Sequence, residues 1–495
     1  MEKKSIKWEQ IFNFAYYFFL VLLIIWLICF RTEIWLHKAT FFHDEAALLM
    51  NIKEKSFLDL FKTLDYLQYC PIFFLIFNKI IYNIYGLNEV ALCFLPYIAG
   101  IFSIILIPFL SNKIFPNKAF SFLFLILFAY HPNTTIASQT FKQYSTDIFI
   151  TLIILYLFFS LKDKIKTKKH FLITGFFFGI IGFFSFTSEF LIFPIFTYFI
   201  FKLIKIKNIK SSILITLPYL TLLSFEVLLL KSTYANGMNE WNNFPTIFNS
   251  YNDFSETISL FISYLGNQNL IFYSFIIGII VLYIKNKLLI YILLAPIILN
   301  IITQILEIYP FPTIQNNRAI IYITPILMII GMKAFEIITL LYKSKKANYI
   351  INIVVIVISI YLLSFIFKIH FLQNKIYINN NYYYFILTNT KEYINHLENN
   401  NVKPSDKIIV DKMGHISFNL YSNNKYKTNA IYLADDLVPL EYIQEGEYIW
   451  FYNTQYKGCT DEWMNGLKEW INKHCEIILY KRDNMGELLY VRKIK

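Results

Sequence analysis

The sequence predicts an α-helical polytopic membrane protein with a small α/β domain at its C-terminal end. Of its 495 residues, 57% are hydrophobic and only 16% are charged, and the mean hydropathy is +0.49. Runs of about 20 mostly apolar residues recur, which is the length a helix needs to cross a bilayer. From about residue 370 the composition turns to Asn, Asp, Glu and Lys with short β-rich runs.

The basic residues follow the pattern of a membrane protein rather than of a nucleic-acid-binding protein. The formal net charge is +12, but the lysines stand in short clusters between apolar runs. Cytoplasmic loops carry such clusters in polytopic proteins. We therefore expect the lipid bilayer as a partner and no nucleic acid.

The alternation of lysine-rich and lysine-poor loops predicts about 11 spans. Lys3, Lys4 and Lys7 place the N-terminus in the cytoplasm, and Ile11–Phe30 leads into an external loop over 31–88. Two interfacial helices are expected in that loop, and two hidden crossings there would raise the count to 13. The predicted helices of the loop are Asp44–Phe61 and Pro71–Tyr85, and the later spans are Glu89–Leu110, Ala119–Tyr130, Ile148–Leu161, Phe171–Phe186, Phe190–Ile204, Ile213–Leu230, Ile271–Ile284, Leu288–Ile308, Ala319–Leu341 and Tyr349–Phe367.

The predicted domains are 1–369, a transmembrane domain, and 370–495, an α/β domain. An odd number of spans after a cytoplasmic N-terminus places the second domain outside the cytoplasm. Cys459 and Cys475 form a disulfide there only if the compartment is oxidising, and spacing alone does not decide their pairing. The expected strands are Lys407–Val410, Tyr448–Tyr452, Glu476–Tyr480 and Leu488–Val491, and the expected helices are Thr390–Leu397 and Asp461–Lys473.

An acidic pair in His43-Asp44-Glu45-Ala46 follows the first span. Carboxylates beside a bilayer lose hydration, so such residues are unfavourable unless they are used. The alternative is that Asp44 caps an amphipathic helix.

Two further external segments carry charged residues. FKQYSTDIFI contains Lys142, Tyr144 and Asp147, and His131 precedes it. Asp147 is either a site residue or the N-cap of the next helix. Arg318 stands in YPFPTIQNNRAIIY at an external span end, where it either binds a lipid phosphate or snorkels to the interface.

Together these residues suit group transfer from a lipid phosphate outside the cytoplasm. An acid can act as general base on a hydroxyl, while cations offset the charge of a phosphate leaving group. Glu189 and Glu226 are weaker candidates, since either can instead pair with a lysine such as Lys231.

The order of four motifs resembles the GT-C glycosyltransferases, in the branch of protein O-mannosyltransferases and lipid A aminoarabinose transferases. The motifs are HDEAALL, YCPIFFLIFNKIIYNIYGLNEVALCFLPYIAGIFSI, KQYSTDIFI and NNRAIIYITPIL, and they span about residues 10–340. The chain departs from the family where Gln68-Tyr69 stands near the place of a lysine, and where Phe94-Leu95-Pro96 lacks an arginine.

The resemblance implies an integral membrane glycosyltransferase that moves a hexosyl or pentosyl group from a polyprenyl-phosphate donor to an extracytoplasmic protein, lipid or glycan with inversion. It implies catalytic roles for Asp44, Glu45 and Asp147 and donor-phosphate binding by Arg318 and Lys142. Some relatives use a divalent metal, but this sequence has no clear ligand set and we expect no certain cofactor. His43, Tyr69, Tyr144 and His131 are candidate substrate-binding residues.

Two other functions remain open. A transporter or lipid-linked sugar flippase would use acids in the membrane as coupling sites, but the chain shows neither repeats nor broken helices of that kind. A receptor-like protein would explain the α/β domain but not the acids of the external loops.

Overall fold

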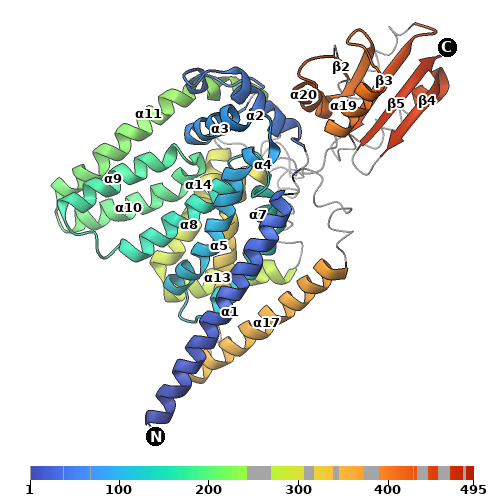
Figure 1. The fold of residues 1–495 in the computed structure, drawn as a ribbon. Coiled ribbons are helices and arrows are strands. Elements are labelled where there is room, and N and C mark those ends of the chain that lie inside the picture. The colour runs from blue at the N-terminus through green and yellow to red at the C-terminus, as the bar shows by residue number, and fades with distance from the viewer. Residues whose placement is uncertain are drawn as a thin grey trace.

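A computed structural model describes the chain over residues 2–36, 38, 40–66, 68–241, 269–305, 317–337, 345–372, 390–426, 428–431, 444–454, 469–482 and 486–494. Most of this part is helical, and a single sheet follows near the C-terminus (Figure 1). The N-terminus and the sheet lie at opposite ends of the helical part.

The long helices pack mainly against partners that are not their neighbours in the sequence. α1 (Glu2–Leu36) lies along the outside and contacts α5. The other closely packed pairs are α9 (Lys168–Gly182) with α11 (Ile209–Trp241), α5 (Phe94–Ile114) with α8 (Tyr144–Leu161), α13 (Asn269–Lys285) with α15 (Thr324–Lys333), α10 (Glu189–Lys205) with α14 (Lys287–Ile305), and α6 (Ala119–Tyr130) with α17 (Lys345–Leu372).

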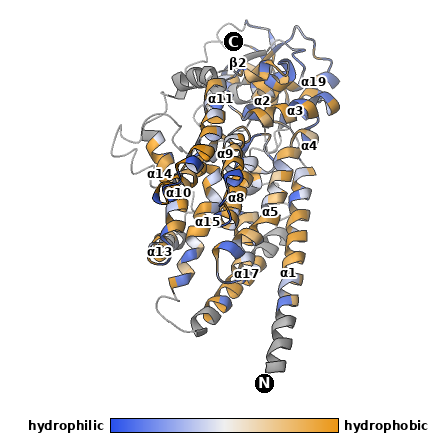
Figure 2. Ribbon diagram, turned by 90° about the vertical axis from the view of Figure 1, so that its left-hand side faces the viewer, coloured by the Kyte–Doolittle hydropathy of each residue, from blue (hydrophilic) through white to orange (hydrophobic). Residues whose placement is uncertain are grey.

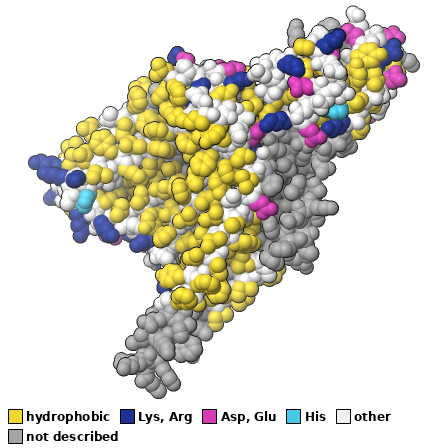
Figure 3. Space-filling view, in the orientation of Figure 1, with side chains coloured by type: hydrophobic (Ala, Val, Ile, Leu, Met, Phe, Trp, Pro, Cys, Tyr) yellow, Lys and Arg dark blue, Asp and Glu magenta, His cyan; other side chains and the backbone are white. Residues whose placement is uncertain are grey.

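The helical part has the surface of a membrane protein. Large apolar side chains such as Phe18, Phe109 and Phe201 are exposed. Most of the long helices are rich in hydrophobic residues (Figure 2), and hydrophobic side chains cover most of the face of the helical part that is in view in Figure 3. Soluble proteins rarely expose apolar surface on this scale, whereas lipid tolerates it. In the described residues, five segments have the length and hydropathy of a span: Asn13–Leu36, Phe94–Ile114, Tyr144–Leu161, Phe186–Lys205 and Ile209–Leu228.

Small residues allow the closest helix contacts. A Cβ on Gly175 of α9 would overlap the backbone carbonyl of Ile215 in α11. Glycine therefore lets these two backbones approach directly, as small residues do in membrane helix pairs.

The first loop forms a helical layer over one end of the long helices. It contains α2 (His43–Glu54), the 3₁₀ turn η1 (Asp59–Phe61), α3 (Ile72–Tyr85) and α4 (Glu89–Leu92). Its apolar cluster includes Phe41 and Phe74, together with Phe141 from the segment before α8 and Leu420 from the C-terminal part. Three distant segments therefore share one core.

The C-terminal part is a five-stranded mixed sheet with the order β2-β1-β3-β5-β4. β1 is parallel to β2 and β3, whereas β5 is antiparallel to β3 and β4. Alternate residues of β1 and β3 enter two different clusters, as the period of a strand requires. The elements are α19 (Thr390–Asn399), β1 (Lys407–Asp411), α20 (Lys412–Tyr421), β2 (Thr428–Ile431), β3 (Tyr448–Thr454), β4 (Cys475–Arg482) and β5 (Gly486–Lys493).

Several predicted elements differ in the structure. The expected span Ala319–Leu341 begins as a 3₁₀ helix, η3 (Asn317–Ile323), continues as α15 and ends in η4 (Ala334–Glu336). Pro325 lies in the first turn of α15, where its missing N–H is tolerated, so the α-helix starts there. The expected helix Asp44–Phe61 ends at Glu54, because the extended backbone of Lys55 interrupts it before η1.

Other predictions are not decided. The count of about 11 spans exceeds the five long segments in the described residues, which also contain five shorter apolar helices of 10–17 residues. The division at residue 369/370 stays a prediction. Cys459 lies outside the described residues, so its pairing with Cys475 is not described.

Candidate functional site

The acidic pair occupies the first turn of α2. The helix begins at His43, which makes Asp44 its second residue and Glu45 its third. The Phe42 backbone is extended, and its N–H donates to Glu45 Oε2 at 2.9 Å. Glu45 therefore satisfies a backbone donor that the helix itself leaves open, while Asp44 is half-buried.

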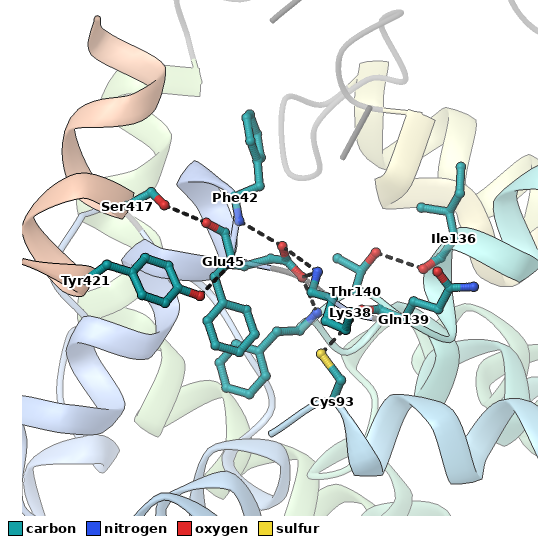
Figure 4. A network of polar contacts seen from close by, with 11 residues as sticks. Lys38, Phe42, Glu45, Cys93, Ile136, Gln139, Thr140, Ser417 and Tyr421 are labelled. Carbon is teal, nitrogen blue, oxygen red and sulfur yellow. Dashed lines mark hydrogen bonds and ion pairs between the residues drawn. The ribbon is translucent and has the colours of Figure 1, made fainter. Parts of the chain in front are cut away.

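Glu45 is held by three donors (Figure 4). Lys38 Nζ lies 2.7 Å from Oε1 and 3.0 Å from Oε2, and the Phe141 N–H donates to Oε1 at 2.6 Å. The Lys38 and Glu45 side chains are 0% and 2% exposed. The bond to Phe141 fixes the start of α2 to the segment that leads into α8.

The same segment carries Lys142, which is buried. Its ammonium donates to the amide oxygen of Gln68 in the first loop. The Cys70 thiol donates to Gln143 Oε1 at 3.4 Å. The first loop and the segment before α8 are thus joined by a bond at Phe141, at Lys142 and at Gln143.

Asp147 lies in the first turn of α8 and is only 3% exposed. The hydroxyls of Ser185 and Thr187, from the turn between α9 and α10, flank its carboxylate. Asp147 Oδ1 has no hydrogen-bond partner in the part of the chain that the structure describes. A buried acid with an unused oxygen is unfavourable unless a ligand or a proton satisfies it.

The charges of Lys142 and Asp147 act on the Cys70 thiol. Burial raises the pKa of the Cys70 thiol well above its ordinary value, Lys142 opposes that change and Asp147 adds to it. Cys70 therefore stays a neutral thiol at neutral pH and is a poor nucleophile.

The four remaining predicted residues lie in different parts of the structure. His131 lies between α6 and α7 (Pro132–Ala137), where burial and the charge of Arg31 lower its pKa to about 4. Tyr69 packs on Phe186 with ring centroids 4.5 Å apart, and Tyr144 is the first residue of α8. Arg318 belongs to η3, but its side chain lies outside the described part. Its distance from Asp44, Lys142 and Asp147 is therefore not described.

Sequence reasoning missed Arg31, which is 1% exposed. Its Nη1 donates to Thr134 O and Ser138 Oγ at 2.7 Å each, and its Nη2 donates to Ala129 O at 2.9 Å. Arg31 thus holds the end of α6 and all of α7 in place. The available signal was an arginine directly after the first span, in a chain whose basic residues are mostly lysines.

Sequence reasoning also missed the contact of α20 with the first loop. The Phe41 N–H donates to Tyr421 Oη at 2.8 Å, and Ser417 Oγ donates to Phe41 O at 2.7 Å. Lys391 also reaches Glu89 at 2.8 Å. Both backbone groups of Phe41, two residues before His43, are therefore satisfied by one face of α20 (Figure 4).

No group of three or more His, Cys, Asp or Glu residues that can hold a metal occurs in the described residues. The candidate site instead contains the half-buried acid Asp44, the buried ammonium of Lys142 and the buried acid Asp147, which has an unused oxygen. These are parts for proton transfer and for binding an anion.

No family model and no curated sequence matches the chain. Among solved structures, it is similar to ArnT from Cupriavidus metallidurans bound to undecaprenyl phosphate, with a TM-score of 0.49 and 9% identity over 94% of this chain and 97% of that one. The apo state of the same protein gives a TM-score of 0.48 and 10% identity, with the same coverage. These structures are of the family that the motif order resembles. At this identity, the function is argued from the chain's own residues.

Proposed function

We propose that the chain is a membrane glycosyltransferase that moves a sugar from a polyprenyl-phosphate donor to a nucleophile outside the cytoplasm. The observation that carries the proposal is the joining of the Asp44 loop to the Lys142–Asp147 segment by the Glu45–Phe141 and Lys142–Gln68 hydrogen bonds. A base and a cation from distant segments are thereby held in one buried framework.

In this proposal Asp44 is the general base. Its neighbour Glu45 has both oxygens occupied by Lys38, Phe42 and Phe141, so Glu45 positions the loop rather than exchanging a proton. Asp44 is half-buried and remains accessible to an acceptor hydroxyl. It takes the hydroxyl proton as the acceptor oxygen bonds to the anomeric carbon of the sugar.

Lys142 and Arg318 are the proposed partners of the donor phosphate. The bond between the anomeric carbon and the phosphate oxygen breaks as the new bond forms, and the electron pair leaves with the polyprenyl phosphate. Attack from the opposite face inverts the anomeric centre. A phosphate oxygen is a stronger partner for an ammonium than the neutral amide of Gln68, so a donor can displace that amide from Lys142.

The test is sugar transfer by the purified protein. Labelled polyprenyl-phosphate sugars are incubated with an envelope preparation, and the label is followed into its protein, lipid and glycan fractions. We expect Asp44→Asn to lower the rate about 100-fold or more. Asp59→Asn is the matched control, because Asp59 is an acid of the same loop that is paired with Lys62 at the surface.

Three outcomes would contradict the proposal or a part of it. Transfer at the wild-type rate by Asp44→Asn would remove Asp44 as the base. Unchanged donor binding by Arg318→Ala would remove that residue from the phosphate site, and no transfer of any sugar by the wild type would refute the enzyme itself.

The alternative is a polytopic transporter or lipid-linked sugar flippase. It is favoured by one observation, the presence of Glu189 and the buried Glu226 inside candidate spans. Movement of a labelled lipid-linked sugar across reconstituted vesicles, without any transfer, would support it over the enzyme.

A further inference from the structure

A pocket lies between the first loop and the turn that joins α9 to α10, and its space of about 420 Å³ includes the open solvent at its mouth. Its wall contains the aromatic side chains of Phe61, Tyr69, Phe183 and Phe186. Two charged residues, Lys62 and Glu226, also line it. Lys62 is mostly exposed and pairs with Asp59 at 2.7 Å, so Glu226 is the buried polar group of the pocket.

Glu226 is 4% exposed, and its Oε2 has no hydrogen-bond partner in the described residues. A Cβ on Gly182 would overlap this oxygen, so the glycine leaves the room that the carboxyl group occupies. A larger residue at 182 would displace Glu226.

Glu189 lies on the other side of the same glycine. Its Oε2 accepts from the hydroxyl of Tyr219 at 2.6 Å, and its Oε1 has no partner in the described part. A Cβ on Gly182 would lie 3.1 Å from Glu189 Oε1. The free oxygens of the half-buried Glu189 and the buried Glu226 therefore meet at one small residue.

Two carboxylates within about 4–6 Å of one another are not both ionised readily in a buried setting. If one carries a proton, the pair offers a hydrogen-bond donor and an acceptor side by side. Aromatic faces next to such a pair give apolar contact. A polyhydroxylated ring, with hydroxyls at its edge and C–H groups on its face, matches both features.

The pocket adjoins the residues proposed for the donor phosphate. Tyr69 packs on Phe186 inside the pocket and is the direct neighbour of Gln68, which holds Lys142. On the other wall, Ser185 and Thr187 flank Phe186 in the chain, and their hydroxyls lie at Asp147. The pocket and the phosphate residues are thus built from the same two segments.

We propose that this pocket binds the sugar ring of the lipid-linked donor, with Glu226 bonding its hydroxyls, Glu189 next to Glu226, and Tyr69 and Phe186 covering the face of the ring. The inference rests on the proposed function and extends it from the phosphate to the sugar. Glu226 is then a residue that determines which sugar is accepted.

The experiment compares two ligands that differ only in the sugar. For wild type, Glu226→Gln and Gly182→Ala, we would measure the KM for a polyprenyl-phosphate sugar and the Kd for bare polyprenyl phosphate. We expect both variants to raise the KM about tenfold or more, because a site built to bond a hydroxyl loses that bond. The Kd for bare polyprenyl phosphate should stay within twofold. Glu54→Gln, an exposed acid at the end of α2, is the control for loss of charge.

Each other outcome counts against the inference. An unchanged KM in Glu226→Gln refutes the sugar subsite while leaving the enzyme intact. If the variants bind both ligands equally more weakly, Glu226 and Gly182 act on the lipid, on the phosphate or on the structure rather than on the sugar. Binding of Mn²⁺ by the wild type that Glu226→Gln abolishes makes the pair a cation site instead. Absence of any sugar transfer by the wild type refutes the proposed function, and the subsite with it.

Discussion

At the scale of single residues, two adjacent acids have different environments. Glu45 is 2% exposed and bonded to Lys38, Phe42 and Phe141, whereas Asp44 is half-buried on the same helical turn. Adjacent residues of a helix point about 100° apart, so one enters the core while the other lines its edge. The sequence motif alone assigns both to one function.

Replacing Glu45 by alanine should destabilise the protein strongly. The change leaves the Lys38 ammonium buried without its carboxylate and removes the acceptor of two backbone N–H groups. Breaking such a buried pair costs about 3–5 kcal/mol of unfolding free energy. Thermal unfolding in detergent measures the change, with Glu54→Ala as the exposed control on α2. Equal melting temperatures for the two variants would contradict the role of Glu45.

His131 should make stability depend on pH. Its folded pKa is about 4, below its ordinary value of 6.5, so the folded state favours the neutral ring. The unfolded chain binds a proton below pH 6.5, and the folded chain does so only near pH 4. This contribution is therefore complete above pH 6.5 and is lost as the pH falls from 6.5 towards 4.

The measurement for His131 is the melting temperature of wild type and His131→Gln between pH 4 and pH 7.5. The variant should lose less stability over the acid half of the range. Parallel curves for the two proteins would show that His131 is as easily protonated in the folded state as in the unfolded state.

At the scale of elements, α20 holds the segment before α2. Ser417 and Tyr421, one turn apart on α20, bond the carbonyl and the N–H of Phe41. Burial raises the pKa of Tyr421 well above its ordinary value, so its hydroxyl stays protonated. A helix of the C-terminal part thereby sets the position of the loop that carries Asp44.

Loss of this contact should lower turnover more than donor affinity. In Ser417→Ala or Tyr421→Phe, one buried backbone group of Phe41 loses its partner, at a cost of about 1–3 kcal/mol. We expect kcat for sugar transfer to fall about tenfold, since the base is displaced, while the donor KM changes less than twofold. Lys425→Ala, which breaks an exposed pair with Glu398 and a contact with the Tyr426 ring, is the control and should behave as wild type. A rise in the donor KM together with the fall in kcat, or no change in either, would argue against positioning.

Several helices and strands were predicted correctly from sequence patterns alone. Apolar runs bounded by polar residues place α6 at Ala119–Tyr130 in both prediction and structure, and β-rich runs mark β1, β3, β4 and β5. α20 and β2 were missed, because their apolar residues follow no clear period and their partners are distant in the chain.

The candidate site was also predicted only in part. Composition singles out Asp44, Lys142 and Asp147, but it does not reveal the Phe41–Tyr421 bond, which joins residues 380 positions apart. The roles of the candidate residues stay predictions.

At the scale of the whole molecule, the N-terminus and the C-terminal sheet lie at opposite ends of the helical part (Figure 1). With the lysine-rich N-terminus in the cytoplasm, the sheet would then lie outside. A phosphatase reporter fused after Lys495 should be active, and one fused before Met1 should be inactive. An inactive C-terminal fusion together with an active N-terminal fusion would overturn the predicted orientation.

The contact between Phe41 and Ser417 spans 376 residues of chain, and this has a consequence for biosynthesis. At roughly 5–20 residues per second, the ribosome needs about 20–75 s to make the distance between them. Throughout that interval the loop with Asp44 has been made but lacks the helix that holds it. A nascent chain, or one cut short before α20, would lack the partners of the Phe41 backbone, so a segment made late determines when this contact can form.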